Sequence, residues 1–161
     1  MAQARQHPAL SLLLMAAMSL LASHAAAAPR AAACVAAHAK AVQAEQGTAE
    51  QGREAFEACA LAAFGKTVAP RLQRCHDDLA EVPVILLYRA EGLSRGAAQA
   101  DLQRAGQLDD GSDYARRAPV MLGFAYQGAG PAAGKAREWM DARLVDWTEQ
   151  CLSGRLPGLR L

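Results

Sequence analysis

Apolar residues recur along most of this chain, and their spacing changes after the first thirty positions. The run at residues 9–22 has no charged side chain, follows the positive charge of Arg5, and leads into a stretch of small residues. It is shorter than the roughly 20 apolar residues that a membrane-spanning helix needs. A basic start, a short apolar core and small residues are typical of a secretory signal peptide rather than an uncleaved anchor. We therefore predict a signal peptide over residues 1–27, cleaved near Ala25–Ala27.

Beyond the signal peptide, the apolar residues repeat every three or four positions, as on the buried face of a helix. This pattern predicts one helix over residues 31–45 and a second over residues 49–64, where Thr48 and Gln51 form a capping box. The short connection predicts an antiparallel hairpin within residues 28–65. The expected inward positions of the first helix are Cys34, Val35, His38, Ala41 and Val42, and those of the second are Phe56, Cys59, Ala60, Ala63 and Phe64.

Four more helices follow from the same periodicity, with glycines at their ends. We expect them at residues 67–91, kinked or restarted at Pro83, then at 95–105, at 113–127 with a bend at Pro119, and from 131 or 132 to 153. The sequence thus predicts an all-α fold, a compact bundle of about five to six helices. Its predicted extent is residues 28–154, with the hairpin at 28–65, the main bundle at 66–154 and a flexible tail at 155–161.

Four cysteines remain after cleavage, and an even number in an exported chain favours two disulfides. Cys34 and Cys59 lie at nearly equal distances from the predicted hairpin turn, so the hairpin would bring them side by side. Cys75 lies near the start of its helix and Cys151 near the end of the last helix, and these ends meet if the two helices are antiparallel. We therefore prefer Cys34–Cys59 with Cys75–Cys151, while Cys34–Cys75 with Cys59–Cys151 remains the next choice.

Composition and charge narrow the function classes. The region after residue 27 is rich in alanine and poor in β-branched residues, which favours helix over sheet. Its 16 basic and 16 acidic side chains balance, so nucleic acid is not an expected partner. The apolar stretch at residues 82–88 is too short to span a bilayer. We expect no membrane span after cleavage, and the oligomeric state stays open.

No arrangement of residues predicts catalysis, cofactor binding or a metal site. The cysteines lack the CxxC spacing of a redox pair. Cys75-His76 resembles the end of a haem-attachment motif, but Leu72 occupies the place of its first cysteine. The predicted mature domain holds two histidines, His38 and His76, and His38 falls on an apolar stripe where packing is the simpler role. We interpret His76 as a surface residue beside a structural cystine.

The carboxylates Asp77, Asp78 and Glu81 lie within one or two helical turns of one another. Partly buried carboxylate pairs can act as a general acid and base. We interpret these three as a solvated acidic face, which is the commoner arrangement. A cell-wall hydrolase would instead need a cleft that joins them to His76.

One resemblance involves the second half of the chain: Cys75 on a helix, the segment YRAEGLS at 88–94, and a last helix ending in WTEQC at 147–151. This order resembles a diffuse group of small exported helical proteins of Gram-negative bacteria. Its layout is also similar to the helical immunity proteins that block type VI secretion amidase effectors. The resemblance implies an exported helical protein, and it assigns no functional residue.

These observations favour a non-enzymatic periplasmic or secreted protein that binds another protein, in an inhibitory, immunity or accessory role. Trp139 and Trp147 are expected core anchors, and with Arg89 they are interface candidates wherever they are exposed, because tryptophan and arginine dominate binding hot spots. The alternative is a small-ligand or cofactor carrier with a pocket near Trp139, Tyr88 and Tyr126.

Overall fold

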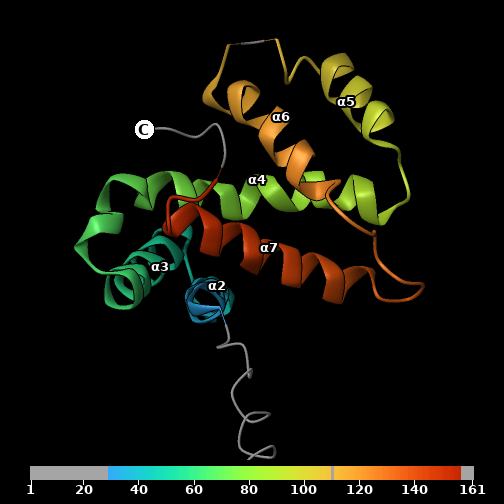
Figure 1. Ribbon diagram of the computed structural model, residues 1–161. Helices are drawn as coiled ribbons and strands as arrows, with labels where there is room; N and C mark the ends of the chain where they lie inside the picture. Colours follow the sequence, from blue (N-terminus) through green and yellow to red (C-terminus); the bar gives the residue numbers. More distant parts are fainter. Residues whose placement is uncertain (1–28, 110, 157–161) are drawn as a thin grey trace, which may run out of the picture.

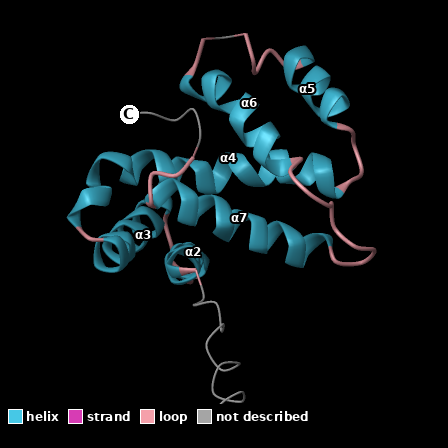
Figure 2. Ribbon diagram, in the orientation of Figure 1, coloured by secondary structure: helices cyan, strands magenta, loops and turns pink. Residues whose placement is uncertain are grey.

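The computed structural model describes residues 29–109 and 111–156, and every regular element within them is helical (Figures 1 and 2). The signal peptide predicted at 1–27 lies outside the described residues, as does the tail from 157 onward. Within the described ranges, no helix combines the length and apolarity required to cross a membrane. The helices are α2 (Arg30–Gln43), α3 (Ala49–Phe64), the 3-10 helix η1 (Lys66–Arg71), α4 (Leu72–Ala90), α5 (Arg95–Arg104), α6 (Asp113–Ala125) and α7 (Ala136–Leu152).

The long helices α4 and α7 lie side by side in the middle of the molecule and run in opposite directions (Figure 1). The hairpin of α2 and α3 packs at the end where α4 begins and α7 ends, while α5 and α6 lie beyond α4 on the other side. This all-α arrangement confirms the predicted fold class. Both α5 and α6 begin at serine caps, because Ser94 and Ser112 accept hydrogen bonds from the backbone N–H groups of Ala97 and Ala115.

Two disulfides join the helices, and they are the pairs preferred from the sequence. Cys34–Cys59 links α2 to α3 with a Cα–Cα distance of 5.2 Å, and Cys75–Cys151 links α4 to α7 at 5.8 Å. The alternative pairing is therefore wrong. Each cystine fixes one antiparallel pair of helices, so the hairpin and the central pair each carry a covalent link.

The hairpin is anchored to the central pair through Glu149 of α7. Its carboxylate accepts a hydrogen bond from the backbone N–H of Ala31 (2.9 Å) and pairs with the guanidinium of Arg30 (3.3 Å). Pro29 provides no side-chain cap for α2, so this distant carboxylate satisfies a free N–H and faces the positive end of the helix dipole. The start of α2 is therefore held against α7 as well as against α3.

The helix boundaries follow the predictions closely except at two starts. The helix predicted over 67–91 opens with the 3-10 helix η1, and α4 begins only at Leu72. The last helix begins at Ala136 rather than at 131 or 132. Gly134 adopts a left-handed φ of 72°, which ends the preceding turn and delays the helix. Pro83 and Pro119 are accommodated inside α4 and α6. Of the tail predicted at 155–161, Leu156 is buried within the hydrophobic core and so does not fit a flexible segment, while residues from 157 onward are not described.

Because Gly52 has no side chain, the two helices of the hairpin can approach closely at this position. A Cβ atom at this position would lie 2.5 Å from Val42 Cγ2 and 2.9 Å from His38 Nδ1. We expect overpacking in Gly52→Ala to lower the free energy of unfolding by about 1–3 kcal/mol. The higher helix propensity of alanine should offset up to about 1 kcal/mol of this loss. Gly96 is the control, since nothing lies within 4 Å of a Cβ there and Gly96→Ala should hold or raise the melting temperature. Thermal unfolding in which both variants gain stability would contradict the tight contact.

Candidate functional site

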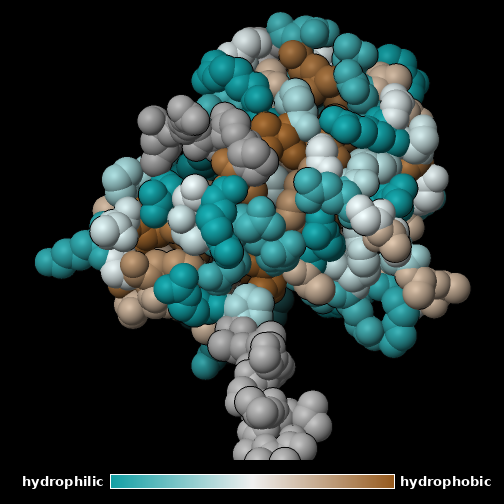
Figure 3. Space-filling view, viewed as in Figure 1, coloured by the Kyte–Doolittle hydropathy of each residue, from teal (hydrophilic) through white to brown (hydrophobic). Residues whose placement is uncertain are grey.

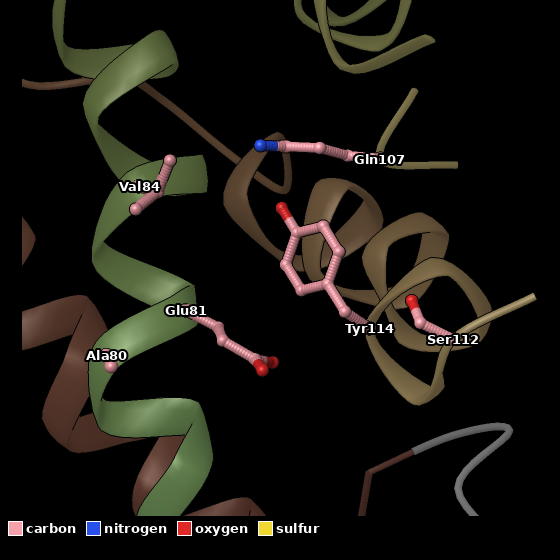
Figure 4. A pocket seen from close by; sticks show the side chains of 6 residues that line it. All are labelled: Ala80, Glu81, Val84, Gln107, Ser112 and Tyr114. Carbon is pink, nitrogen blue, oxygen red and sulfur yellow. The ribbon is translucent and has the colours of Figure 1, made fainter. Parts of the chain in front are cut away.

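Two neighbouring hollows open along α4, and they meet at Ala80 and Glu81, which line both. The first, of about 270 Å³, lies between α4 and the start of α6 (Figure 4). The second, of about 410 Å³, lies between α4 and the α2–α3 hairpin. We call the pair the α4 groove. The first hollow is lined by Ala80, Glu81, Val84, Gln107, Ser112 and Tyr114, and the second by His38, Val42, Ala49, His76, Asp77, Leu79, Ala80 and Glu81.

The first hollow combines an apolar floor with polar groups at its rim. Glu81 extends from α4 and Tyr114 from the first turn of α6 into the space between these helices, and Gln107 reaches across from the preceding loop (Figure 4). Val84 is 48% exposed, which is high for an aliphatic side chain. Burial, and next the nearby charge of Glu81, raise the pKa of Tyr114 above its usual range. The phenol therefore stays protonated and available as a donor at neutral pH.

The second hollow contains both histidines of the described chain. The rings of His38 and His76 meet edge to face with centroids 5.1 Å apart, and the His76 ring also lies 5.8 Å from that of Phe56. Both ring nitrogens of His76 and Nδ1 of His38 are buried without a hydrogen-bond partner. The expectation that His76 is a simple surface residue is therefore wrong, since only 16% of its side chain is exposed. It packs there because it follows Cys75, which the cystine holds in the core.

This histidine pair predicts how stability depends on pH. Burial, and next the charge of His38, lower the pKa of His76 below its ordinary value of 6.5, although Asp77 and Glu57 act in the opposite direction. As the pH falls through the ordinary value, the unfolded chain takes up this proton more readily than the folded chain. We therefore expect the free energy of unfolding to fall between about pH 7.5 and about pH 5.5.

Urea denaturation across that pH range, with wild type and His76→Gln compared, measures the effect. The variant should show a shallower loss of stability toward acid, because glutamine does not titrate. Equal slopes for the two proteins would show that His76 does not carry this dependence.

A cluster of charges centred on the buried side chains of Arg117 and Asp78 lies beside the groove and ties α4, α6 and α7 together. The Arg117 guanidinium on α6 binds the Asp78 carboxylate, pairs with Glu81 at 2.6 Å and with Asp113 at 2.7 Å. Asp78 also accepts a hydrogen bond from the indole N–H of Trp147 (2.8 Å). The side chains of Arg117 and Asp78 are 4% and 0% exposed. We call Asp78, Glu81, Asp113, Arg117 and Trp147 the charge cluster.

The charge cluster corrects the interpretation of Asp77, Asp78 and Glu81 as one solvated face. Asp78 points into the core, while Asp77 and Glu81 face the second hollow. Asp78 lies three residues after Cys75 and so shares its inward face of α4. A buried carboxylate is retained only where a cation and donors satisfy it, and here Arg117 and Trp147 do so.

Glu81 connects the charge cluster to the α4 groove. Burial raises its pKa above the usual range, and the charges of Asp77 and Asp113 raise it further. It nevertheless lies against Arg117, which favours its ionised form. The groove therefore presents a carboxylate whose position is fixed by a buried partner, and such a group suits recognition of a cation.

The interface candidates do not meet at one surface. Trp147 is fully buried in the charge cluster, where it is a core anchor. Trp139 is half-buried against the core, and Arg89 lies over the ring of Tyr126 with a centroid distance of 5.0 Å. The hydroxyls of Tyr126 and Tyr88 donate to Leu93 O (2.9 Å) and Asp101 (2.7 Å). The carrier pocket expected near these aromatics thus has its phenols engaged within the fold.

Sequence reasoning missed Arg117 and Tyr114 as site residues. The signal that could have found Arg117 is its position on α6, in phase with the apolar Met121 and Phe124.

Within residues 29–109 and 111–156, no three His, Cys, Asp or Glu side chains are grouped so as to hold a metal ion. The α4 groove offers two recesses with apolar surface and a carboxylate, Glu81, that Arg117 holds in place. Comparisons of the chain with protein-family models, curated proteins and solved structures find no match.

Proposed function

We propose that this chain is an exported helical protein that binds another protein and has no enzymatic activity of its own, in an inhibitory, immunity or accessory role. The observation that carries the proposal is the α4 groove, where exposed aliphatic side chains border two hollows on a doubly cross-linked frame. Val42 and Val84 are 40% and 48% exposed in the hollows, and Leu87 is 45% exposed one turn beyond Val84. Apolar side chains presented in recesses are typical anchors for a partner's residues.

The rigidity of the frame supports this role. The second hollow lies between α4, which a disulfide joins to α7, and the hairpin, which carries the other disulfide. The first hollow lies between α4 and α6, which the ion pairs of Arg117 with Asp78 and Glu81 hold together. A preformed surface loses less conformational entropy on binding than a flexible one. On the face seen in Figure 3 most residues are polar, and the strongly hydrophobic ones show mainly between helices. This fits recognition at a local site.

The disulfides also support an exported location, with the predicted signal peptide at 1–27 and release into the periplasm or medium. Structural disulfides persist in oxidising compartments and are rare in the cytosol. Both cystines here lie between packed helices, and Cys34 and Cys75 are fully buried, which fits a structural role rather than a redox function.

Partner capture tests the proposed function. The oxidised chain, secreted with a C-terminal tag, is used to isolate proteins from the periplasm and medium of the producing organism and of rival strains. We expect one protein to co-purify in a fixed ratio and to rebind when both are purified. Failure to recover any such protein, together with failure to protect cells against a rival's effectors, would remove the proposal.

A cell-wall hydrolase is the second candidate, because His76, Asp77 and Glu81 do line one hollow. Three observations weaken it. Asp77 accepts a hydrogen bond from Gln73 (2.8 Å), Glu81 is held by Arg117, and His76 Nδ1 lies 3.7 Å from Asp77, beyond hydrogen-bonding distance. Release of soluble fragments from purified peptidoglycan by wild type but not by His76→Gln would favour this candidate over binding alone.

A further inference from the structure

We infer that the α4 groove takes an exposed segment of the partner that carries a lysine or arginine about three positions from an aliphatic or aromatic residue. This inference rests on the proposed function and specifies the chemistry of the partner. The basic side chain would occupy the first hollow, and the apolar one would occupy the second.

The first hollow has the features that suit a long basic side chain. Its methylene groups would lie along Ala80 and Val84, since lysine and arginine bury their stems against apolar surface. Its charged head would reach the rim, where the Glu81 carboxylate can accept hydrogen bonds, the Tyr114 ring can face a cation and the Gln107 side chain lies opposite (Figure 4). These groups come from α4, the α5–α6 loop and α6, so the fold brings them together from three places in the chain.

Charge supports a basic occupant rather than an acidic one. The charged residues that line the described hollows of the α4 groove are Asp77 and Glu81, both acids, with no lysine or arginine in either lining. The guanidinium of Arg117, which binds Glu81, is already shared with Asp78 and Asp113. Glu81 is the acid that borders the first hollow, and the charge of Asp77 acts on it from the second. A cation beside Glu81 would offset that repulsion, whereas a carboxylate there would add to it.

The second hollow supplies the apolar contact. Val42, Ala49 and Leu79 contribute aliphatic surface from α2, α3 and α4. Asp77 and Val84 are separated by seven residues of α4, a rise of about 10 Å. An extended segment covers about 3.3 Å per residue, so a basic and an apolar residue about three positions apart would reach both hollows.

A peptide-display selection tests the inference without knowledge of the natural partner. A random library of peptides about 12 residues long, enough to cover both hollows, is selected on the oxidised chain. We expect enriched peptides to share a lysine or arginine about three positions from an apolar residue. For synthetic versions, Val84→Lys should weaken binding at least about tenfold. Leu61→Lys is the matched control, because Leu61 is 39% exposed on α3 and lines neither hollow.

The role of Glu81 is tested by a double-mutant cycle. Replacing the peptide's arginine by citrulline removes the charge and keeps the shape, so wild type should bind the citrulline peptide more weakly. Glu81→Gln keeps an acceptor for Arg117 and should remove most of that difference, whereas Glu54→Gln on the exposed surface of α3 should preserve it. Circular dichroism and urea denaturation establish that each variant is folded.

Three outcomes would overturn the inference: no enriched peptide, enriched peptides without a basic residue, or binding that Val84→Lys leaves unchanged. A dimer of the chain that Val84→Lys dissociates would instead show that a second copy occupies the groove. If the natural partner bound wild type and Val84→Lys equally, the α4 groove would not be its binding site, and the proposed function would still stand. If no protein bound the chain, the proposed function itself would be contradicted.

Discussion

Replacing Arg117 by methionine is expected to lower the free energy of unfolding by about 3–5 kcal/mol, because it leaves the Asp78 carboxylate buried without its cation. Asp78 is completely inaccessible to solvent, and Trp147 alone would remain as its donor. Losses of this size are a large part of the net stability of a small domain, about 5–15 kcal/mol. The measurement is equilibrium urea denaturation followed by circular dichroism.

Arg116 provides the matched control for this experiment. It is the neighbouring arginine of α6, its side chain is 67% exposed, and it pairs with Asp113 at the surface. Arg116→Met should therefore change stability by no more than about 0.5–1 kcal/mol. Adding Asp78→Asn to Arg117→Met should recover part of the loss, because asparagine removes the buried charge and can still accept from Trp147. Equal effects of the two arginine substitutions would contradict the charge cluster.

Removing the Cys75–Cys151 disulfide by alanine substitution of both cysteines is the second change with a large expected effect. The bond spans 76 residues of sequence, and on the chain-entropy account its loss costs about 4.5 kcal/mol. Removing Cys34–Cys59, which spans 25 residues, should cost about 3.5 kcal/mol on the same account. The two paired-alanine variants are compared by urea denaturation without reductant.

Reduction of wild type by dithiothreitol is the control, because it should lower stability by more than either paired substitution does. A Cys75→Ala and Cys151→Ala variant as stable as wild type would show that packing of α4 on α7 needs no cystine. A reversed order of the two variants would indicate that the hairpin link restricts the unfolded chain more than its length suggests.

Much of the framework could be predicted from the sequence because it depends on local signals. Glycine and serine positions mark the ends of helices through backbone conformation and capping, and α3 was predicted with its observed bounds. The disulfides followed from helix length and antiparallel packing alone. Cys34 and Cys59 are equally far from a turn, and this geometry does not depend on how the hairpin packs elsewhere.

The site could not be predicted in the same way, because it depends on contacts between distant segments. Asp78 and Arg117 are 39 positions apart, and each looks like an ordinary surface charge in its own helix. Their position in phase with apolar neighbours becomes informative only when α4 and α6 are known to pack together. Tyr114 likewise enters the groove because α6 begins opposite Glu81, which the loop between α5 and α6 determines.

The charge cluster and the α4 groove are parts of one arrangement. Arg117 holds Glu81 from within, and Glu81 in turn separates the two hollows at the surface. Loss of Arg117 should therefore weaken partner binding even in molecules that remain folded, since Glu81 would lose its fixed position. The stability of the core and the shape of the binding site depend on the same guanidinium.

Site-specific photo-crosslinking in the producing cell tests the central claim most directly, namely that the α4 groove binds another protein. A benzophenone side chain is placed at Val84 in the groove or at Leu61 outside it, two positions of similar exposure. We predict that irradiation links the Val84 protein to one other protein as a discrete species of higher mass, and that the Leu61 protein gives no such species. Crosslinks absent from both positions, or identical at both, would contradict the claim.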